Sequence, residues 1–201
     1  YELTQDVNRY IKDVPIYQGE ASGAIEANNQ NNHAQGVESF AEGHNTQARG
    51  QYSHAEGQNT LASATSSHAE GYYTQSINNM AHAEGNATVA SGGQAHAEGQ
   101  NSQALGTDSH AQNLGTIARY LQTAIGSYNI AQGSNTTKVD TDHALIIGNG
   151  NDADHRSNAL AVQWDGTVVF QDGSTMKSAK TVYYVSTSGN DNNNGTQSSP
   201  L

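Results

Sequence analysis

Residues 53–112 read SHAEGQN TLASATS SHAEGYY TQSINNM AHAEGNA TVASGGQ AHAEGQN SQALGTD SHAQ. This stretch repeats every 14 residues, and each repeat divides into two halves of seven. Two polar residue types keep the 14-residue period: His54, His68, His82, His96 and His110, and Glu42, Glu56, Glu70, Glu84 and Glu98. Repeats at a fixed period indicate stacked supersecondary units, so we expect a repeat architecture.

Small residues keep the shorter period of seven. They are Ala34, Ala41, Ala48, Ala55, Ala62, Ala69, Ser76, Ala83, Ala90, Ala97, Ala104, Ala111 and Ala118. Glycine follows most of them two residues later, at positions 36, 43, 50, 57, 71, 85, 92, 99 and 106. A coiled coil also repeats every seven residues, but it needs large apolar residues at two positions of each heptad. A glycine in each heptad would destabilise a helix by about 1 kcal/mol, so strands fit the pattern better.

Strand alternation explains the order of residues within each half-repeat. In residues 67–71 a period of two places Ser67, Ala69 and Gly71 on one face, and His68 and Glu70 on the other. Two short strands and two turns then make one coil of a narrow solenoid that only small side chains fill. We expect Gly or Asn at the strand ends to supply the positive φ of the turns.

The pattern S-x-A-x-G-x-x-[ST]-x-A-x-G-x-x resembles the head repeat of YadA-like trimeric autotransporter adhesins. The wording SHAEG resembles the repeat segments of phage tail fibres and appendages, some of which end in an autoproteolytic chaperone. The resemblance covers residues 27–133. It implies an all-β fold, a homotrimer of left-handed parallel β-rolls built from 14-residue coils. His and Glu stand where the adhesins usually carry Val and Ile.

We divide the chain into four parts. Residues 1–19 are an N-terminal helix and connector, 20–133 the β-roll, 134–180 a β-hairpin collar, and 181–201 the start of a truncated domain. The spacing of Leu3, Val7, Tyr10 and Val14 predicts a short helix that Pro15 ends. A frayed amphipathic helix is the alternative for this segment.

The repeat loses its phase before the collar. The pattern degrades after Asn113 and resumes one residue early at Ala124, which predicts a bulge or kink within residues 119–123. Residues 134–142 are polar and linker-like. Beyond them we expect a strand at 144–147, a turn at 148–150, and a hairpin of 159–164 with 167–170 about Asp165-Gly166, closed by Asp172-Gly173.

The final segment, TVYYVSTSGNDNNNGTQSSPL, resembles the opening of a pectate-lyase-like parallel β-helix. That resemblance implies a following β-helix domain that binds or cuts polysaccharide. Because the sequence starts at Tyr1 and stops within this motif, we expect it to be a piece of a longer protein.

Composition excludes several classes of function. The chain has no cysteine, which rules out disulfides and thiolate chemistry. A net charge of −11 argues against a nucleic-acid partner, and no stretch is apolar and long enough to span a membrane. A coil filled with alanine encloses little apolar surface, so we expect burial against two further copies to stabilise it.

We predict that the histidines and glutamates form a polar column at the trimer interface, with His–Glu hydrogen bonds between chains repeating about every 4.8 Å. The predicted column comprises His54, Glu56, His68, Glu70, His82, Glu84, His96, Glu98 and His110. If the glutamates outweigh burial, the histidine pKa should be raised. We expect no catalytic residue, metal or cofactor, because catalysis needs one special site rather than five equivalent ones.

Two metal sites are alternatives to this interpretation. Histidines near a threefold axis could bind zinc or nickel. His143 and His155 flank a loop with Asp140, Asp142, Asp152 and Asp154, which could bind calcium.

The expected function is a structural and host-attachment segment of a trimeric phage tail fibre, spike or appendage in the virion tail. Its expected partners are two further copies, other virion tail proteins and a host cell-surface polysaccharide. The head or stalk of a bacterial trimeric surface adhesin is the alternative. We expect no enzymatic activity in this segment, although the parent protein could carry a glycan-active β-helix or the chaperone.

Overall fold

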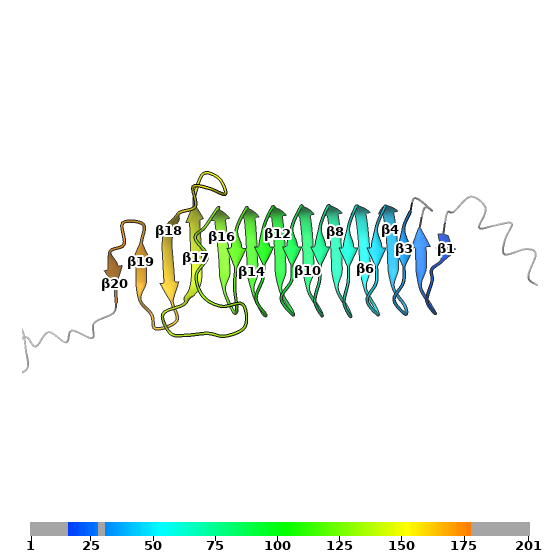
Figure 1. The fold of residues 1–201 in the computed structure, drawn as a ribbon, viewed down its shortest axis with the longest axis horizontal. Coiled ribbons are helices and arrows are strands. Elements are labelled where there is room, and N and C mark those ends of the chain that lie inside the picture. The colour runs from blue at the N-terminus through cyan, green and yellow to red at the C-terminus, as the bar shows by residue number, and fades with distance from the viewer. Residues whose placement is uncertain (1–15, 28–30, 178–201) are drawn as a thin grey trace, which may run out of the picture.

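The computed structural model describes residues 16–27 and 31–177, which form an all-β rod with no helix (Figure 1). Thirteen strands make the larger sheet: β1 (Ile16–Gln18), β2 (Ile25–Ala27), β4 (Phe40–His44), β6 (His54–Gln58), β8 (His68–Tyr72), β10 (His82–Asn86), β12 (His96–Gln100), β14 (His110–Leu114), β16 (Thr123–Ser127), β17 (His143–Asn149), β18 (Asn158–Gln163), β19 (Val168–Phe170) and β20 (Thr175–Met176). Seven two-residue strands make the second sheet: β3 (His33–Ala34), β5 (Gln47–Ala48), β7 (Leu61–Ala62), β9 (Gln75–Ser76), β11 (Val89–Ala90), β13 (Gln103–Ala104) and β15 (Ile117–Ala118).

Each coil contributes one five-residue strand and one two-residue strand, and both pair in parallel with the next coil. His82 lies opposite His96 and Val89 lies opposite Gln103, so the register advances by one 14-residue repeat per coil. The described chain therefore forms a parallel β-solenoid of about seven coils. The predicted all-β solenoid is confirmed.

The interior of the solenoid consists of small side chains. The alanines of the seven-residue period are 0% exposed from Ala34 to Ala118, with Ser76 equally buried in their row. A second buried row holds mainly Ser and Thr. Several of their hydroxyls donate to nearby backbone carbonyls: Ser53 donates to Gly50 and Ser109 to Gly106, both at 2.6 Å, whereas the hydroxyls of Thr60 and Thr74 have no partner. These bonds satisfy polar groups that burial would otherwise leave unpaired.

The glycines at the ends of the long strands differ from the expected alternation. Gly71 is exposed rather than facing inward with Ser67 and Ala69, because its φ of +106° interrupts the regular alternation within β8. A Cβ built there would lie 2.2 Å from the carbonyl oxygen of Gly85 in the next coil. The sequence therefore needs glycine here for both backbone conformation and close approach of the coils.

Many left-handed turn positions carry neither Gly nor Asn, contrary to our expectation. Tyr73, Met80 and Ala87 have φ values of 57°, 55° and 55°. Their N–H groups donate to carbonyls of the preceding coil; that of Met80, for example, donates to Thr65 at 3.0 Å. Pairing between coils thus holds a conformation that usually costs roughly 1–2 kcal/mol per residue outside glycine.

The repeat is one residue shorter near residues 119–123, and the difference lies in a turn. Residues 119–122 connect β15 to β16, whereas residues 105–109 connect β13 to β14. The strands on either side stay paired, with Ala111 opposite Ala124. The left-handed position falls on Leu121, with a φ of 57°. The sheet thus continues in register through a shortened connection.

The C-terminal strands extend the larger sheet. β17 pairs in parallel with β16, and β18, β19 and β20 follow as antiparallel strands. The predicted hairpin about Asp165-Gly166 is confirmed, and Gly166 has the positive φ of +84°. The turn predicted at 148–150 is wrong in part, because β17 continues through Gly148 and Asn149.

β1 and β20 lie at opposite ends of the rod (Figure 1). The helix predicted over residues 1–14 and the β-helix opening predicted over 181–201 lie outside the described residues. In the part of the chain that is described, no helix has the length and apolar character needed to cross a membrane.

Candidate functional site

The histidines and glutamates of the repeat line one outward face of the larger sheet. Each long strand from β6 to β12 begins with His-Ala-Glu-Gly, and the Ala between the two polar residues is buried in the core. Strand alternation therefore projects both polar side chains to the same side. The column histidines are 33–36% exposed in the single chain, so their rings lie half-buried against the sheet. We call these two rows the His–Glu ladder.

The five histidine rings of the ladder stack face to face. Neighbouring ring centroids lie 4.7–4.9 Å apart with interplanar angles of 3–11°. Phe40 extends the stack by one ring, 5.1 Å from His54. The rings repeat at the spacing of adjacent strands, because hydrogen bonding between those strands sets their separation.

Each histidine pairs with the glutamate of the preceding coil in the same chain. The Nε2–Oε1 distances are 3.4 Å for His54–Glu42, 3.4 Å for His68–Glu56, 3.5 Å for His82–Glu70, 3.7 Å for His96–Glu84 and 3.1 Å for His110–Glu98. Only the last pair is within hydrogen-bonding geometry. This offset of 12 residues within one chain was not foreseen, while the hydrogen bonds expected between chains stay a prediction.

Four ladder nitrogens are buried and have no hydrogen-bond partner. They are the Nε2 atoms of His54, His68, His82 and His96. Unpaired buried polar atoms are uncommon in folded proteins and call for a specific explanation. A carboxylate oxygen lies 3.4–3.7 Å from each nitrogen, without the geometry of a hydrogen bond.

The pKa of His96 is lowered from its ordinary value of 6.5, mainly because burial disfavours the charged imidazolium. The neighbouring His82 and His110 lower the pKa further, and the carboxylates of Glu98 and Glu84 oppose the shift without overcoming it. The condition stated for a raised pKa, that the glutamates outweigh burial, is therefore not met at His96. Burial and the adjacent rings favour the neutral imidazole at this rung.

A groove runs beside the glutamate row because the neighbouring row is glycine. One section of about 430 Å³ is lined by Glu56, Gly57, Glu70, Gly71, Glu84, Gly85 and Gly99. A second section of about 480 Å³ continues it along Glu98, Gly99, Gln100, Gln112, Asn113 and Leu114. The groove is acidic along most of its length and open to solvent.

The aspartate-rich loop near the C-terminal strands has a local structural role. Asp152 Oδ1 accepts hydrogen bonds from the backbone N–H groups of Asp154 and His155, and lies 2.8 Å from His155 Nδ1. Asp142 instead accepts a hydrogen bond from the Val139 N–H group. Within residues 16–27 and 31–177, the residue groups that could hold a metal do not include this loop.

One candidate cluster was missed by the sequence analysis. Glu20, Glu26 and His33 bring one ligand atom each within 4.8 Å of one another. His33 Nδ1 lies 3.1 Å from Glu20, and Glu26 accepts the backbone N–H of Ala34. These residues precede the regular SHAEG repeats, so periodicity gave no signal for them.

Comparisons with protein-family models, with curated proteins and with solved structures find no match.

Proposed function

We propose that the chain is a structural and host-attachment segment of a homotrimeric phage tail fibre, spike or appendage. In this proposal three left-handed rolls lie parallel, and the segment positions a downstream domain that binds or depolymerises polysaccharide. The observation that carries the proposal is the equivalence of the coils. Each coil presents the same side chains at the same spacing, which suits a rigid spacer better than a single catalytic centre.

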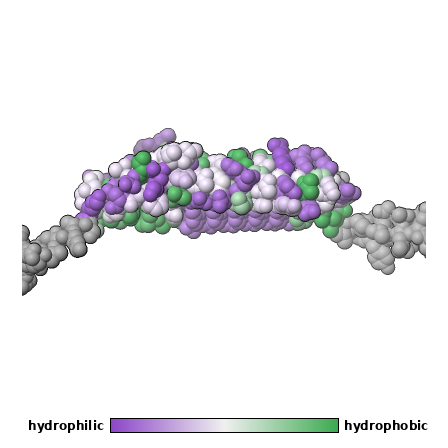
Figure 2. Space-filling model, turned by 90° about the horizontal axis from the view of Figure 1, so that it is seen from below, coloured by the Kyte–Doolittle hydropathy of each residue, from purple (hydrophilic) through white to green (hydrophobic). Residues whose placement is uncertain are grey.

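The composition of the interior supports association with further copies. The core rows contain mainly Ala, Ser and Thr along the seven-coil body, with the larger Asn32, Gln122 and Asn129 near its ends. Large apolar side chains lie outside instead: Ile16, Tyr17, Ile25, Tyr52, Tyr72, Tyr73, Ile77 and Met80 are each more than 40% exposed. Figure 2 shows hydrophobic side chains near both ends of the body and a hydrophilic strip between them. Burying such groups against two copies would add the apolar contact that one roll lacks.

The His–Glu ladder fits this role as a contact surface. Its side chains are half-buried in one chain, and their flat stacked rings present a regular face to a neighbour. The ladder would then align the three rolls rung by rung.

Sedimentation velocity at micromolar concentration tests the oligomeric state. The expected species has three times the chain mass of 21.2 kDa and the high frictional ratio of an elongated particle. Electron microscopy of the same sample should show straight rods. A folded species that sediments as a monomer over the whole concentration range would overturn the proposal.

The bacterial surface adhesin is the second candidate, supported by the same repeat pattern. The two candidates differ in the domain expected after residue 201 of the parent protein. A membrane anchor there would favour the adhesin, and a β-helix or chaperone would favour the phage fibre. Purified chain added to bacteria should compete with phage adsorption only if it belongs to a phage fibre.

A further inference from the structure

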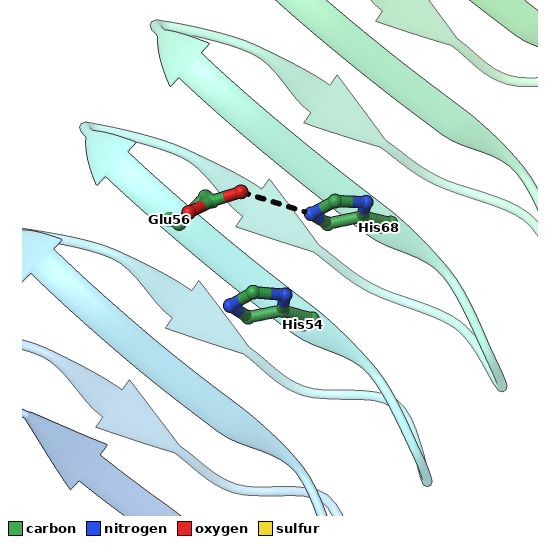
Figure 3. A group of neighbouring side chains, drawn as sticks. All are labelled: His54, Glu56 and His68. Carbon is green, nitrogen blue, oxygen red and sulfur yellow. Dashed lines mark ion pairs between the residues drawn. The ribbon is translucent and has the colours of Figure 1, made fainter.

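The His–Glu ladder brings together ligand sets suited to a transition-metal ion. His54, Glu56 and His68 each offer one ligand atom, and these three atoms lie within 4.8 Å of one another. Figure 3 shows the rings of His54 and His68 parallel on neighbouring strands, with the Glu56 carboxylate facing the edge of the His68 ring. Two imidazole nitrogens and one carboxylate oxygen are a ligand set that zinc accepts, with water completing the coordination.

The same arrangement recurs further along the rod. His82, Glu84 and His96 form a second group within the same 4.8 Å limit. His96 and His110 lie opposite each other in the next pair of strands and stack at 4.9 Å, with Glu98 3.1 Å from His110. Every gap between two ladder histidines therefore contains one glutamate.

The gaps hold imidazole nitrogens that have no hydrogen-bond partner in the described chain. The Nε2 atoms of His68 and His96 are buried without a hydrogen bond, and their nearest carboxylates lie at 3.4 and 3.7 Å. A buried nitrogen without a partner costs free energy. A cation between nitrogen and carboxylate would satisfy both groups. The two histidines of a gap would have to tilt toward each other from their 4.8 Å stacking, because two zinc–nitrogen bonds span at most about 4.2 Å.

The charge along the ladder also favours the binding of a cation. Five glutamates, Glu42, Glu56, Glu70, Glu84 and Glu98, stand in one row at the strand spacing. Over residues 16–27 and 31–177, their ion pairs are with histidines and not with Lys or Arg. When the histidines are neutral the row is a line of like charges, which a divalent cation would neutralise.

We propose that the His–Glu ladder binds divalent transition-metal ions of the zinc class between adjacent coils of one chain. Each ion takes Nε2 from two neighbouring histidines and one carboxylate oxygen from the glutamate in the gap. Because one Nε2 serves one ion, five histidines hold at most two ions per chain. Calcium, which prefers six or more oxygen ligands, does not suit this set. The binding is independent of the proposed trimer, since every ligand of a site belongs to the same chain.

The number of ions bound per chain tests the proposal, because it depends on which ladder histidines remain adjacent to one another. The full chain is stripped of metal, dialysed against Zn²⁺ at pH 7.5, and its bound zinc is measured per chain. His68→Val leaves His54 isolated and only His82, His96 and His110 adjacent, so one ladder ion should be lost. His82→Val leaves two intact pairs, His54 with His68 and His96 with His110, so the second ion moves by one rung and two should still bind.

Matched controls separate the ladder from other ligands. His44→Ala removes an exposed histidine outside the ladder and should leave the count unchanged. Any zinc held by Glu20, Glu26 and His33 is common to all variants, so only differences from the parent chain are interpreted. If His68→Val fails to fold by circular dichroism, His96→Val tests the same loss of one ion. Equal counts in His68→Val and His82→Val, absence of zinc binding, or equal binding of Ca²⁺ would each overturn the proposal.

Discussion

Gly57 and Gly71 lie in adjacent coils so close together that a Cβ on Gly57 would sit 2.2 Å from the carbonyl oxygen of Gly71. Both residues also have φ values near +100°, at 99° and 106°. The contact recurs at Gly71–Gly85 and Gly85–Gly99, each at 2.2 Å. The spacing of the coils therefore leaves no room for a side chain in this row, which also explains why a groove forms there.

The glycine row gives the first prediction. Gly71→Ala should lower the free energy of unfolding by more than about 2 kcal/mol, because the new methyl group meets backbone and the φ is unfavourable for alanine. Gly93→Ala is the matched control, since a Cβ there has its nearest neighbours at 4.0 Å and its φ is not in the positive range. It should change stability by less than about 0.5 kcal/mol. Urea unfolding followed by circular dichroism compares the two, and equal effects would contradict the explanation.

The ladder gives the second prediction, through the His68–Glu56 pair. Glu56→Ala alone should cost about 3 kcal/mol if other copies bury the ladder, because it leaves a buried histidine without its partner. The double change His68→Val with Glu56→Ile should recover most of the loss, as apolar residues replace both members. Thermal melting of the parent, His68→Val, Glu56→Ile and the double variant measures the coupling, because the cycle needs the same substitutions alone and together. A coupling below about 1 kcal/mol would mean that the ladder stays exposed to solvent, as surface pairs are worth little.

Acidification gives the third prediction. The pKa values of His96 and His143 are both lowered from 6.5, and burial is the main cause for each. The unfolded chain therefore binds more protons than the folded chain between the folded pKa values and about pH 6.5. This contribution to stability is fully present above pH 6.5 and declines as the pH falls through that window.

Melting temperatures measured with a chelator at pH 7.5 and pH 5.5 test this direction, and the lower pH should give the lower value. His143→Gln removes one of the two groups and should reduce the difference. A melting temperature that rises on acidification would mean that the carboxylates dominate over burial. NMR titration of the His96 ring reports the folded pKa directly.

Arg156 gives the fourth prediction. Its Nη1 donates to the carbonyls of Gly115 at 2.8 Å and Asn129 at 3.2 Å, and its guanidinium lies 5.6 Å from the centre of the Tyr128 ring. It thus fastens the loop after β17 to the last turns of the solenoid. Arg156→Ala should destabilise this end by about 1.5–3 kcal/mol, the usual range for hydrogen bonds to a charged group. Hydrogen exchange should accelerate in residues 150–157 and remain unchanged in β6 to β10; uniform acceleration would indicate a global effect instead.

The repeat period determined much of the fold in advance. Alternation within SHAEG places Ser67 and Ala69 in the core and His68 and Glu70 outside, as the structure has them. The Asp165-Gly166 hairpin could also be predicted, because the two turn residues themselves favour the turn. These features depend on residues close in sequence.

Other features depend on contacts between coils, which periodicity does not specify. The left-handed φ at Met80 is stabilised by the hydrogen bond that its N–H donates to the neighbouring coil. The residue type therefore did not predict this conformation. The pairing of His68 with Glu56 rather than Glu70 depends on the direction of both side chains along the rod. Gly148 was expected to turn the chain, yet it lies within β17, where a Cβ would meet the Ser127 carbonyl oxygen at 2.5 Å.

The shortened connection at residues 119–122 shows that the turns absorb a change in residue number while the strands do not lose their partners. Gain or loss of a whole 14-residue unit would disturb the stack even less, because each unit meets nearly identical neighbours above and below. Such events, favoured by recombination between near-identical coding repeats, would lengthen or shorten the rod in steps of about 4.8 Å. A gain or loss of seven residues would instead set a two-residue strand against a five-residue strand and break the ladder. The length of the rod can therefore change only in whole coils of 14 residues.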